Sequence, residues 1–234
     1  MGDRQHRRPA WAAALAAAGV VLLLGPAAVW AEPVADTADG PGALTLLAAL
    51  PIKGRAPKTG YHRAQFGPAW SDDVTVPLGH NGCDTRNDIL RRDLTDTEIK
   101  PGTNGCVVLA GVLTDPYSGA VVAFQRGTQT SREVQIDHVV ALSDAWQKGA
   151  QQWDEVTRRN FANDPLNLQA TSGPVNEQKG DGDAATWLPP NRSYRCVYVS
   201  RIVAVKSGYG LWVTQAEHDA IERILTTDCA GGTG

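Results

Sequence analysis

Three stretches of the chain have patterns of apolar and polar residues that we expect of strands. Residues 106–126 contain two apolar runs on either side of the turn sequence DPYSG, a pattern typical of a β-hairpin. The segment EVQID (133–137) alternates between polar and apolar residues, and the short apolar run PLNLQAT (165–171) favours a further strand. The sequence therefore predicts a hairpin and two separate strands.

Other stretches have the spacing of helices. Residues 143–163 place Trp, Val and Phe at helical intervals, but Gly149 interrupts them, so we expect two helical pieces. Residues 172–180 have a proline near the first helical position and a glycine at the end, which predicts one short helix. A helix should also begin near Asp84 or Thr85, because both are good N-caps. Further helices are expected at residues 43–50, 193–206 and 214–225.

A strand, a second strand and a short helix thus fall within residues 133–180, with a helical insert between the strands. Such a unit can bring side chains from three elements to one point. The predicted fold class is α+β, with this unit as its core, a supporting β-hairpin and peripheral helices. The chain has 234 residues, of which 42% are hydrophobic and 20% charged. This composition fits one compact domain, which we place at residues 51–230.

The N-terminal region has the pattern of a secretory signal. Three arginines precede an uncharged run over residues 9–31, which ends with small residues at the positions of a leader-peptidase site. We therefore interpret residues 1–31 as a signal peptide and expect a secreted protein. The alternative is an uncleaved anchor, since the run is long enough to span a membrane, but Pro26 and the many alanines disfavour it. Residues 32–50 are predicted to form a flexible lead-in that ends in the short apolar helix.

The net charge limits how this protein could contact nucleic acid. The whole chain has a charge of −3, and removal of residues 1–31 takes away three arginines and one aspartate, which leaves −5. An acidic protein binds a polyanion only through a local basic patch or a bound cation. One candidate patch is the stretch 51–63, which has four basic residues and no acid. It is either a solvated loop or an arm that contacts phosphates.

Four cysteines lie beyond the predicted signal, and no two of them have C-x-x-C spacing. That spacing disfavours a four-thiolate zinc site, and export favours disulfide bonds. Three pairings are possible. We favour Cys83 with Cys106 and Cys196 with Cys229, because each bond would close a local loop within its own half of the chain. Both bonds would be structural.

The chemistry-bearing residues gather in the strand–strand–helix unit. Asp137 and His138 stand side by side at the end of the first strand. Adjacent strand residues face opposite sides, so these two can share a site only if the strand twists or ends there. A lone Asp–His pair is more often a structural hydrogen-bonded pair, and asparagines near turns are usually turn formers. The presence of Asn167 and Asn176 in the following elements favours a functional site.

These residues resemble a known motif. The segments DHVVAL, NLQATSGPVN and NEQKG are similar to the HNH, or His-Me finger, nuclease motif, with a DH pair on one strand and two asparagines nine positions apart. More closely, residues 54–225 resemble secreted bacterial HNH endonuclease family proteins, related to the nuclease domain of GmrSD-type restriction enzymes. The blocks GYHRAQFGPAW, CDTRND, QIDHVVALSDAWQKGA, NDPLNLQA and TWLPP also match this family. The resemblance implies a ββα-metal core at about residues 133–180, stapled by the disulfides.

The resemblance also implies an activity and a role for each site residue. The activity is metal-dependent hydrolysis of phosphodiester bonds in nucleic acid, with DNA as the first expectation and RNA as the alternative. Low sequence specificity is expected because no segment resembles a module that reads base edges. His138 would be the general base that activates water. Asp137 and the side-chain oxygen of Asn176 would hold one divalent cation, with Mg²⁺ as the first expectation and Mn²⁺ as the alternative. Asn167 would brace the loop and fix the histidine.

Two further residues are candidate phosphate contacts by the same resemblance. Lys179 would contact the substrate or else lie on the surface at a helix end, and Arg86 is a candidate from the CDTRND block. The alternative function is a catalytically inactive secreted binding domain on the same scaffold. A zinc-dependent hydrolase is disfavoured because the sequence has no H-E-x-x-H segment or clustered histidine pair. No membrane partner is expected after signal cleavage.

Overall fold

The computed structural model describes residues 1–2, 40–128 and 130–229. The predicted signal peptide and most of the predicted lead-in therefore lie outside the described residues. Among the residues that are described, no helix is long and apolar enough to cross a membrane. Residues 40–229 form helices and two antiparallel sheets, so the fold class is α+β, as the sequence predicts.

The larger sheet has three strands in the order β1 (Leu94–Ile99), β2 (Val108–Thr114) and β3 (Val121–Gln125). The predicted hairpin is confirmed as β2 and β3, and the amide of Asp115 closes its turn by donating to the carbonyl of Ala120. β1 is not predicted from the sequence. Its middle residues are exposed and polar, so the strand has no apolar alternation that could indicate it.

The smaller sheet contains the predicted pair of strands. β4 (Val134–His138) pairs antiparallel with β5 (Leu168–Ser172), and α5 (Gly173–Lys179) follows β5 directly. Asn167 differs from its expected place on the strand. It ends the 3₁₀ helix η5 (Pro165–Asn167), because Asp164 caps this turn with its side chain and proline occupies its start.

The insert between β4 and β5 consists of two helical pieces, as predicted. They are α3 (Leu142–Gln147) and α4 (Glu155–Asn163), with a short 3₁₀ turn between them. Gly149 separates the pieces with φ of 133°, a conformation that other residues rarely adopt. Asp154 then caps α4 by accepting a hydrogen bond from the amide of Thr157.

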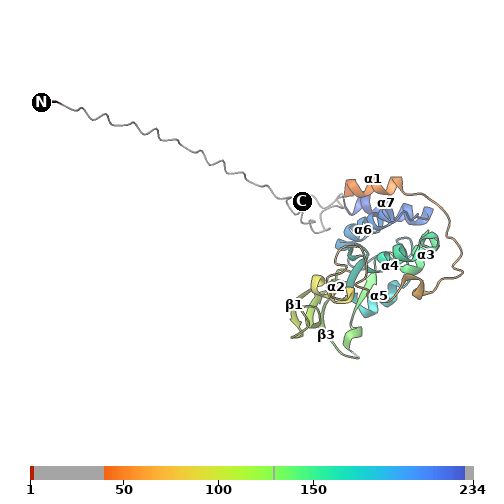
Figure 1. Ribbon diagram of the computed structural model, residues 1–234. Helices are drawn as coiled ribbons and strands as arrows, with labels where there is room; N and C mark the ends of the chain where they lie inside the picture. The colour runs from red at the N-terminus through yellow and green to blue at the C-terminus, as the bar shows by residue number, and fades with distance from the viewer. Residues whose placement is uncertain (3–39, 129, 230–234) are drawn as a thin grey trace. The chain divides into compact units, whose positions relative to one another are not determined.

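A group of helices covers one side of the site. α1 (Gly40–Ala49), α6 (Arg195–Gly208) and α7 (Gln215–Thr227) pack against one another and lie side by side in Figure 1. The Cys196–Cys229 disulfide joins the start of α6 to the residue that follows α7. On the other side, α2 (Thr85–Asp93) begins at its predicted cap, Asp84, and packs against β5.

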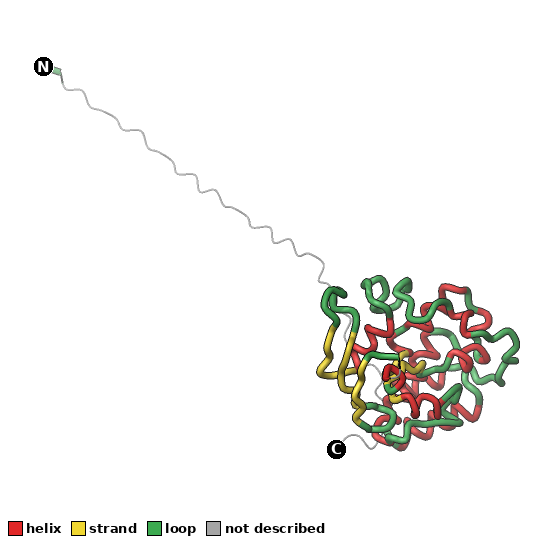
Figure 2. The backbone as a smooth tube through the Cα atoms, turned by 90° about the horizontal axis from the view of Figure 1, so that it is seen from below, coloured by secondary structure: helices red, strands yellow, loops and turns green. Residues whose placement is uncertain are grey.

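Two hydrophobic clusters meet at the end of β4. One lies among the helices and includes Val139 and Val140. The other lies between α2 and the sheets and includes Ile136 and Leu168. Figure 2 shows the three-stranded sheet at one edge and the β4–β5 pair among helices. The chain therefore passes from one cluster to the other at Asp137 and His138, which fixes the backbone on both sides of this pair.

Both predicted disulfide pairings are confirmed. Cys83 bonds to Cys106 and Cys196 bonds to Cys229. The first bond joins the segment before α2 to the segment before β2, and the second closes the α6–α7 pair. No free cysteine is found among the residues that the structure describes.

Candidate functional site

A pocket of about 330 Å³ opens where β4 ends and α5 passes. Three of the predicted site residues line it together: Asp137, His138 and Asn176. The first two come from β4 and the third from α5, so the strand–strand–helix unit gathers these side chains as expected. The remaining lining residues are Tyr61, Arg63, Ile136, Ala141, Leu142, Gly180 and Asp181.

The end of the strand allows two adjacent residues to share this pocket. β4 stops at His138, and the next two amides leave the strand to bond to Asn167. The amide of Val139 donates to the backbone carbonyl of Asn167 at 2.8 Å, and that of Val140 donates to its side-chain oxygen at 2.8 Å. The chain thus turns immediately after the pair, and strict alternation no longer applies.

His138 is buried, with 7% of its surface exposed, and its orientation is fixed by a backbone carbonyl. Its Nε2 lies 2.9 Å from the carbonyl oxygen of Ala162. A carbonyl only accepts, so Nε2 carries the proton and Nδ1 keeps its lone pair in the neutral ring. Burial, followed by the charge of Arg63, lowers the pKa of His138 to about 3. The imidazole is therefore neutral at physiological pH.

Asn167 holds both segments that flank the imidazole. Its side-chain nitrogen donates to the carbonyl of Val140 at 3.3 Å and to the carbonyl of Phe161 at 3.4 Å. Phe161 precedes Ala162, whose carbonyl faces His138. One buried amide therefore ties the loop after β4 to the end of α4, which suits the bracing role expected from the resemblance.

Asp137 is buried and has a partner at each carboxylate oxygen. Lys179 contacts Oδ1 at 3.0 Å, and the hydroxyl of Tyr117 donates to Oδ2 at 2.8 Å. Lys179 also donates to the backbone carbonyl of His138 at 2.8 Å. Burial raises the pKa of Asp137, and the ammonium of Lys179 is the largest influence that opposes this. Lys179 is only 3% exposed, so the expectation of a surface lysine is wrong.

The last two predicted site residues differ in their relation to the pocket. Asn176 lines it, and its side-chain nitrogen donates to Gln135 at 2.8 Å. Among the described residues, the side-chain oxygen of Asn176 has no hydrogen-bond partner. Arg86 lies outside the pocket lining, and its guanidinium donates to the carbonyls of Ser131 and Val134. Arg86 therefore holds the start of β4.

Sequence reasoning missed three residues that shape the site. Tyr117 comes from the hairpin turn, and nothing in the sequence distinguishes it from an ordinary turn residue. Ala162 contributes only its backbone, which leaves no signature in a side chain. Arg63 had a signal, since it belongs to the basic stretch without acids, but the sequence could not say which of the four bases there reaches the pocket.

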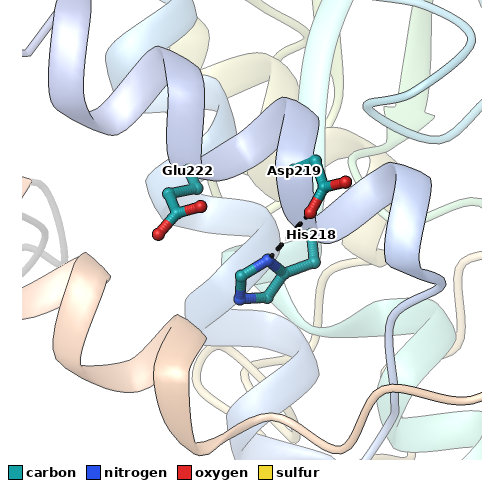
Figure 3. A group of neighbouring side chains, drawn as sticks. All are labelled: His218, Asp219 and Glu222. Atoms are coloured by element: carbon teal, nitrogen blue, oxygen red, sulfur yellow. Dashed lines mark ion pairs between the residues drawn. The ribbon is translucent and has the colours of Figure 1, made fainter.

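A second cluster of metal-type ligands lies on α7, away from the pocket. His218, Asp219 and Glu222 place their ligand atoms within 4.8 Å of one another, and Figure 3 shows that all three project from this helix. Asp219 and Glu222 are exposed, and Nδ1 of His218 lies 3.5 Å from Asp219. An exposed group of neighbours on one helix is an ordinary solvated face, so we assign no metal centre here.

Comparisons with known proteins bear on this pocket. Residues 84–224 match the family model described as GmrSD restriction endonucleases, C-terminal domain. The chain is also similar to a protein of Arthroderma benhamiae described as an uncharacterized secreted protein, with 37% identity over 210 residues. That alignment covers 89% of this chain and 94% of the relative. No solved structure matches the chain. The matched region includes all six predicted catalytic, metal-binding and substrate-binding residues. Of the four cysteines it includes Cys106 and Cys196.

Proposed function

The chain belongs to the family of GmrSD restriction endonuclease C-terminal domains, and from this premise we propose that it is a secreted, metal-dependent endonuclease. Its substrate would be DNA rather than RNA, cleaved with low sequence specificity. The observation that carries the proposal is the convergence of Asp137, His138 and Asn176 on one pocket. In this proposal β4, β5 and α5 form the ββα-metal core of an HNH nuclease.

His138 is the general base in this proposal. Its Nδ1 takes a proton from the attacking water, while the carbonyl of Ala162 accepts the hydrogen bond from Nε2 and stabilises the charge that develops on the ring. A phosphodiester in the pocket would bring negative charge, which would raise the pKa of the imidazole above the low value that burial and Arg63 give it. Substrate binding would therefore make this histidine a stronger base.

The donor set suits a hard divalent cation, Mg²⁺ or else Mn²⁺. Asp137 offers a carboxylate and Asn176 offers an amide oxygen that has no partner among the described residues. Each carboxylate oxygen of Asp137 has one protein contact and retains a second lone pair. These residues would hold the cation, which when bound would neutralise charge on the phosphate and on the leaving oxygen.

For Lys179 and Arg86 we propose roles other than the phosphate contacts that the resemblance implies. Lys179 donates hydrogen bonds to the carboxylate of Asp137 and to the backbone carbonyl of His138, so it positions these two residues. Arg86 donates to backbone carbonyls at the start of β4 and in the preceding turn. We propose that both residues support the site without touching the substrate.

Action outside the cell is part of the proposal. The similar protein is described as secreted, and two disulfides of this kind form in oxidising compartments. The signal peptide expected at residues 1–31 would supply the route of export.

The alternative function, a binding domain that does not catalyse, has one observation in its favour. Both carboxylate oxygens of Asp137 already have protein partners, Lys179 and Tyr117. A scaffold that had lost its cation could be stabilised in this way. The two proposals differ in one measurable property, which is cleavage.

The test is cleavage of supercoiled plasmid by the purified protein with Mg²⁺ or Mn²⁺, with EDTA, and with the variant His138→Asn. Loss of a general base lowers the rate by about 10²–10⁴-fold. The control is His80→Asn, which removes an exposed imidazole outside the pocket at a backbone φ of 57° that asparagine tolerates. A parallel assay with single-stranded RNA separates the two substrate classes.

Each result has a clear meaning. Cleavage that EDTA and His138→Asn both abolish, while His80→Asn retains it, supports the nuclease and its base. Cleavage that survives His138→Asn would show that the base is another residue. Binding of nucleic acid without cleavage under any metal would favour the binding domain.

A further inference from the structure

The basic stretch seen in the sequence is a strap fixed along its length. We use basic strap for residues 53–63. Its first amide, that of Lys53, donates to the carbonyl of Val213 at 3.0 Å, and the amide of Ala56 donates to Gln147 at 2.8 Å. Two indole nitrogens and a glutamine amide donate to three further strap carbonyls, those of Gly54, Pro57 and Thr59. The strap is therefore neither a loose loop nor a free arm.

Three of its four bases are engaged by the protein itself. Arg55 pairs with the buried carboxylates of Asp144 at 2.9 Å and Asp183 at 2.6 Å. Lys58 pairs with Asp181 at 2.9 Å. Lys53 lies over the ring of Trp212, 5.1 Å from its centroid. These contacts use the positive charges to anchor the strap.

Arg63 is the exception. It is exposed and lines the same pocket as His138, and its guanidinium forms no hydrogen bond or ion pair with any described residue. Its backbone is nevertheless held, because Arg63 starts a 3₁₀ turn whose last residue, Phe66, is buried against Trp146 and Phe161. A fixed backbone with an uncommitted guanidinium at a pocket mouth is the arrangement of an anion-binding side chain.

We propose that Arg63 binds a phosphate oxygen of the substrate at the mouth of the pocket, while the other three bases of the basic strap only hold it in place. The inference rests on the proposed nuclease function. A guanidinium matches a phosphate with two parallel hydrogen bonds, which an ammonium cannot reproduce. Among the described residues that line the pocket, Arg63 is the one Lys or Arg, so no other lining side chain can supply a charged contact with two parallel hydrogen bonds.

The experiment compares four full-length proteins: the wild type, Arg63→Ala, Arg63→Lys and Lys53→Ala. The last is a matched control, because it removes the same charge from the same strap outside the pocket. Binding of a fluorescein-labelled DNA oligonucleotide is measured by anisotropy at low salt in EDTA, and plasmid cleavage is measured with Mg²⁺. Thermal melting shows that each variant is folded.

Arg63→Ala should weaken binding and lower kcat/KM by about tenfold or more, which is the worth of a hydrogen bond to a charged group. Arg63→Lys should recover part of this loss, and Lys53→Ala should stay within about twofold of the wild type. Equal effects of Arg63→Ala and Lys53→Ala, in a wild type that binds and cleaves, would overturn the inference and leave the nuclease function standing. A wild type that neither binds nor cleaves would overturn both.

Discussion

Tyr117 and Tyr198 are both fully buried and their rings pack edge to face, yet their hydroxyls have different partners. The hydroxyl of Tyr117 donates to Asp137 at 2.8 Å. The hydroxyl of Tyr198 has no hydrogen-bond partner among the described residues. The same chemical change at the two positions therefore isolates the hydrogen bond that holds the proposed metal-binding carboxylate.

Tyr117→Phe should lower the free energy of unfolding by about 1–3 kcal/mol, because it leaves a buried carboxylate oxygen without its donor. It should also slow cleavage, since Asp137 would no longer be held on both sides. Tyr198→Phe should be neutral or slightly stabilising. Urea denaturation and plasmid cleavage measure both effects. Equal losses from the two substitutions would show that the hydroxyl of Tyr117 has no special role.

The pocket residues that could be predicted from the sequence are those whose side-chain type and spacing match a recognisable pattern. Asp137, His138 and Asn176 could be assigned to one site because a DH pair and a helical asparagine form a recognisable pattern. The carbonyl of Ala162 could not, since any residue at that position offers the same oxygen. The burial of Lys179 could not be predicted from the sequence either, because it depends on how closely α5 packs against β4.

At the scale of elements, Asn167 is the point where three segments meet. It ends η5 and bonds to the loop after β4 and to the last turn of α4. Its donor and acceptor atoms have separate tasks. The oxygen accepts from the amide of Val140, and the nitrogen donates to the carbonyls of Val140 and Phe161.

Asn167→Asp should therefore destabilise the fold by about 1–3 kcal/mol, because it keeps the acceptor and sets a carboxylate against two buried carbonyls. Cleavage should fall further than stability explains, since the backbone around His138 would shift. The matched control is Asn160→Asp in α4, where the lost donor faces the hydroxyl of Thr75, which can rotate to donate instead. The measurements are chemical denaturation and cleavage at a temperature where all the variants are folded.

The second disulfide is expected to stabilise without affecting the pocket directly. Replacing both Cys196 and Cys229 by serine should lower the free energy of unfolding by about 2–4 kcal/mol, because the unfolded chain regains the freedom of a 33-residue loop. Neither cysteine lines the pocket, so cleavage at low temperature should be retained. Urea denaturation measures the first effect. A variant that is as stable as the wild type would contradict this prediction.

The elements that could be predicted from the sequence are those with regularly spaced apolar residues or with clear capping and turn residues at their ends. The β2–β3 hairpin, β4, α5 and the two pieces of the insert all have such signals. β1 has none, because its exposed residues are polar and its pairing with β2 is irregular. The 3₁₀ turn before β5 could not be predicted, because the apolar run 165–171 favours a strand over its whole length. In the structure the Asp164 cap and the proline give its first three residues a 3₁₀ conformation.

At the scale of the whole molecule, charged side chains from distant parts of the chain form a cluster of balanced charge, in which Arg55 is partly exposed and the other five side chains are buried. Three basic and three acidic side chains form ion pairs at distances from 2.6 to 3.2 Å. They come from five parts of the chain: the basic strap, α3 with the residue that ends it, the segment between α5 and α6, α6 itself, and α7. The cluster consists of Arg55, Asp144, Lys148, Asp183, Lys206 and Glu217. No local pattern could indicate it, because its members are scattered along the sequence.

The cluster makes stability depend on acid pH. Burial alone would raise the pKa of Asp183, but Lys148 and Arg55 outweigh it and lower this pKa from 3.8 to about 2. A carboxylate with a lowered pKa in the folded state stabilises fully above its unfolded pKa, and this contribution is lost as the pH falls toward the folded value. The free energy of unfolding should therefore decline between about pH 4 and pH 2.

Urea denaturation at several pH values measures this decline. Asp183→Asn should be less stable than the wild type at neutral pH and should show a shallower decline in acid. Asp181→Asn is the control, because Asp181 lies two residues earlier and its ion pair with Lys58 is exposed. The same pH profile in Asp183→Asn and in the wild type would show that other carboxylates govern acid stability.

The phosphate contact proposed for Arg63, the one Lys or Arg that lines the pocket, would set how DNA binding responds to salt. A protein that binds duplex DNA displaces condensed counterions, and the logarithm of its affinity falls against the logarithm of salt concentration with a slope of about −0.9 per phosphate neutralised. One phosphate contact gives a shallow slope, whereas a broad basic face gives a steep one. An enzyme with this pocket would keep binding in saline fluid, where a protein that relied on many phosphate contacts would dissociate.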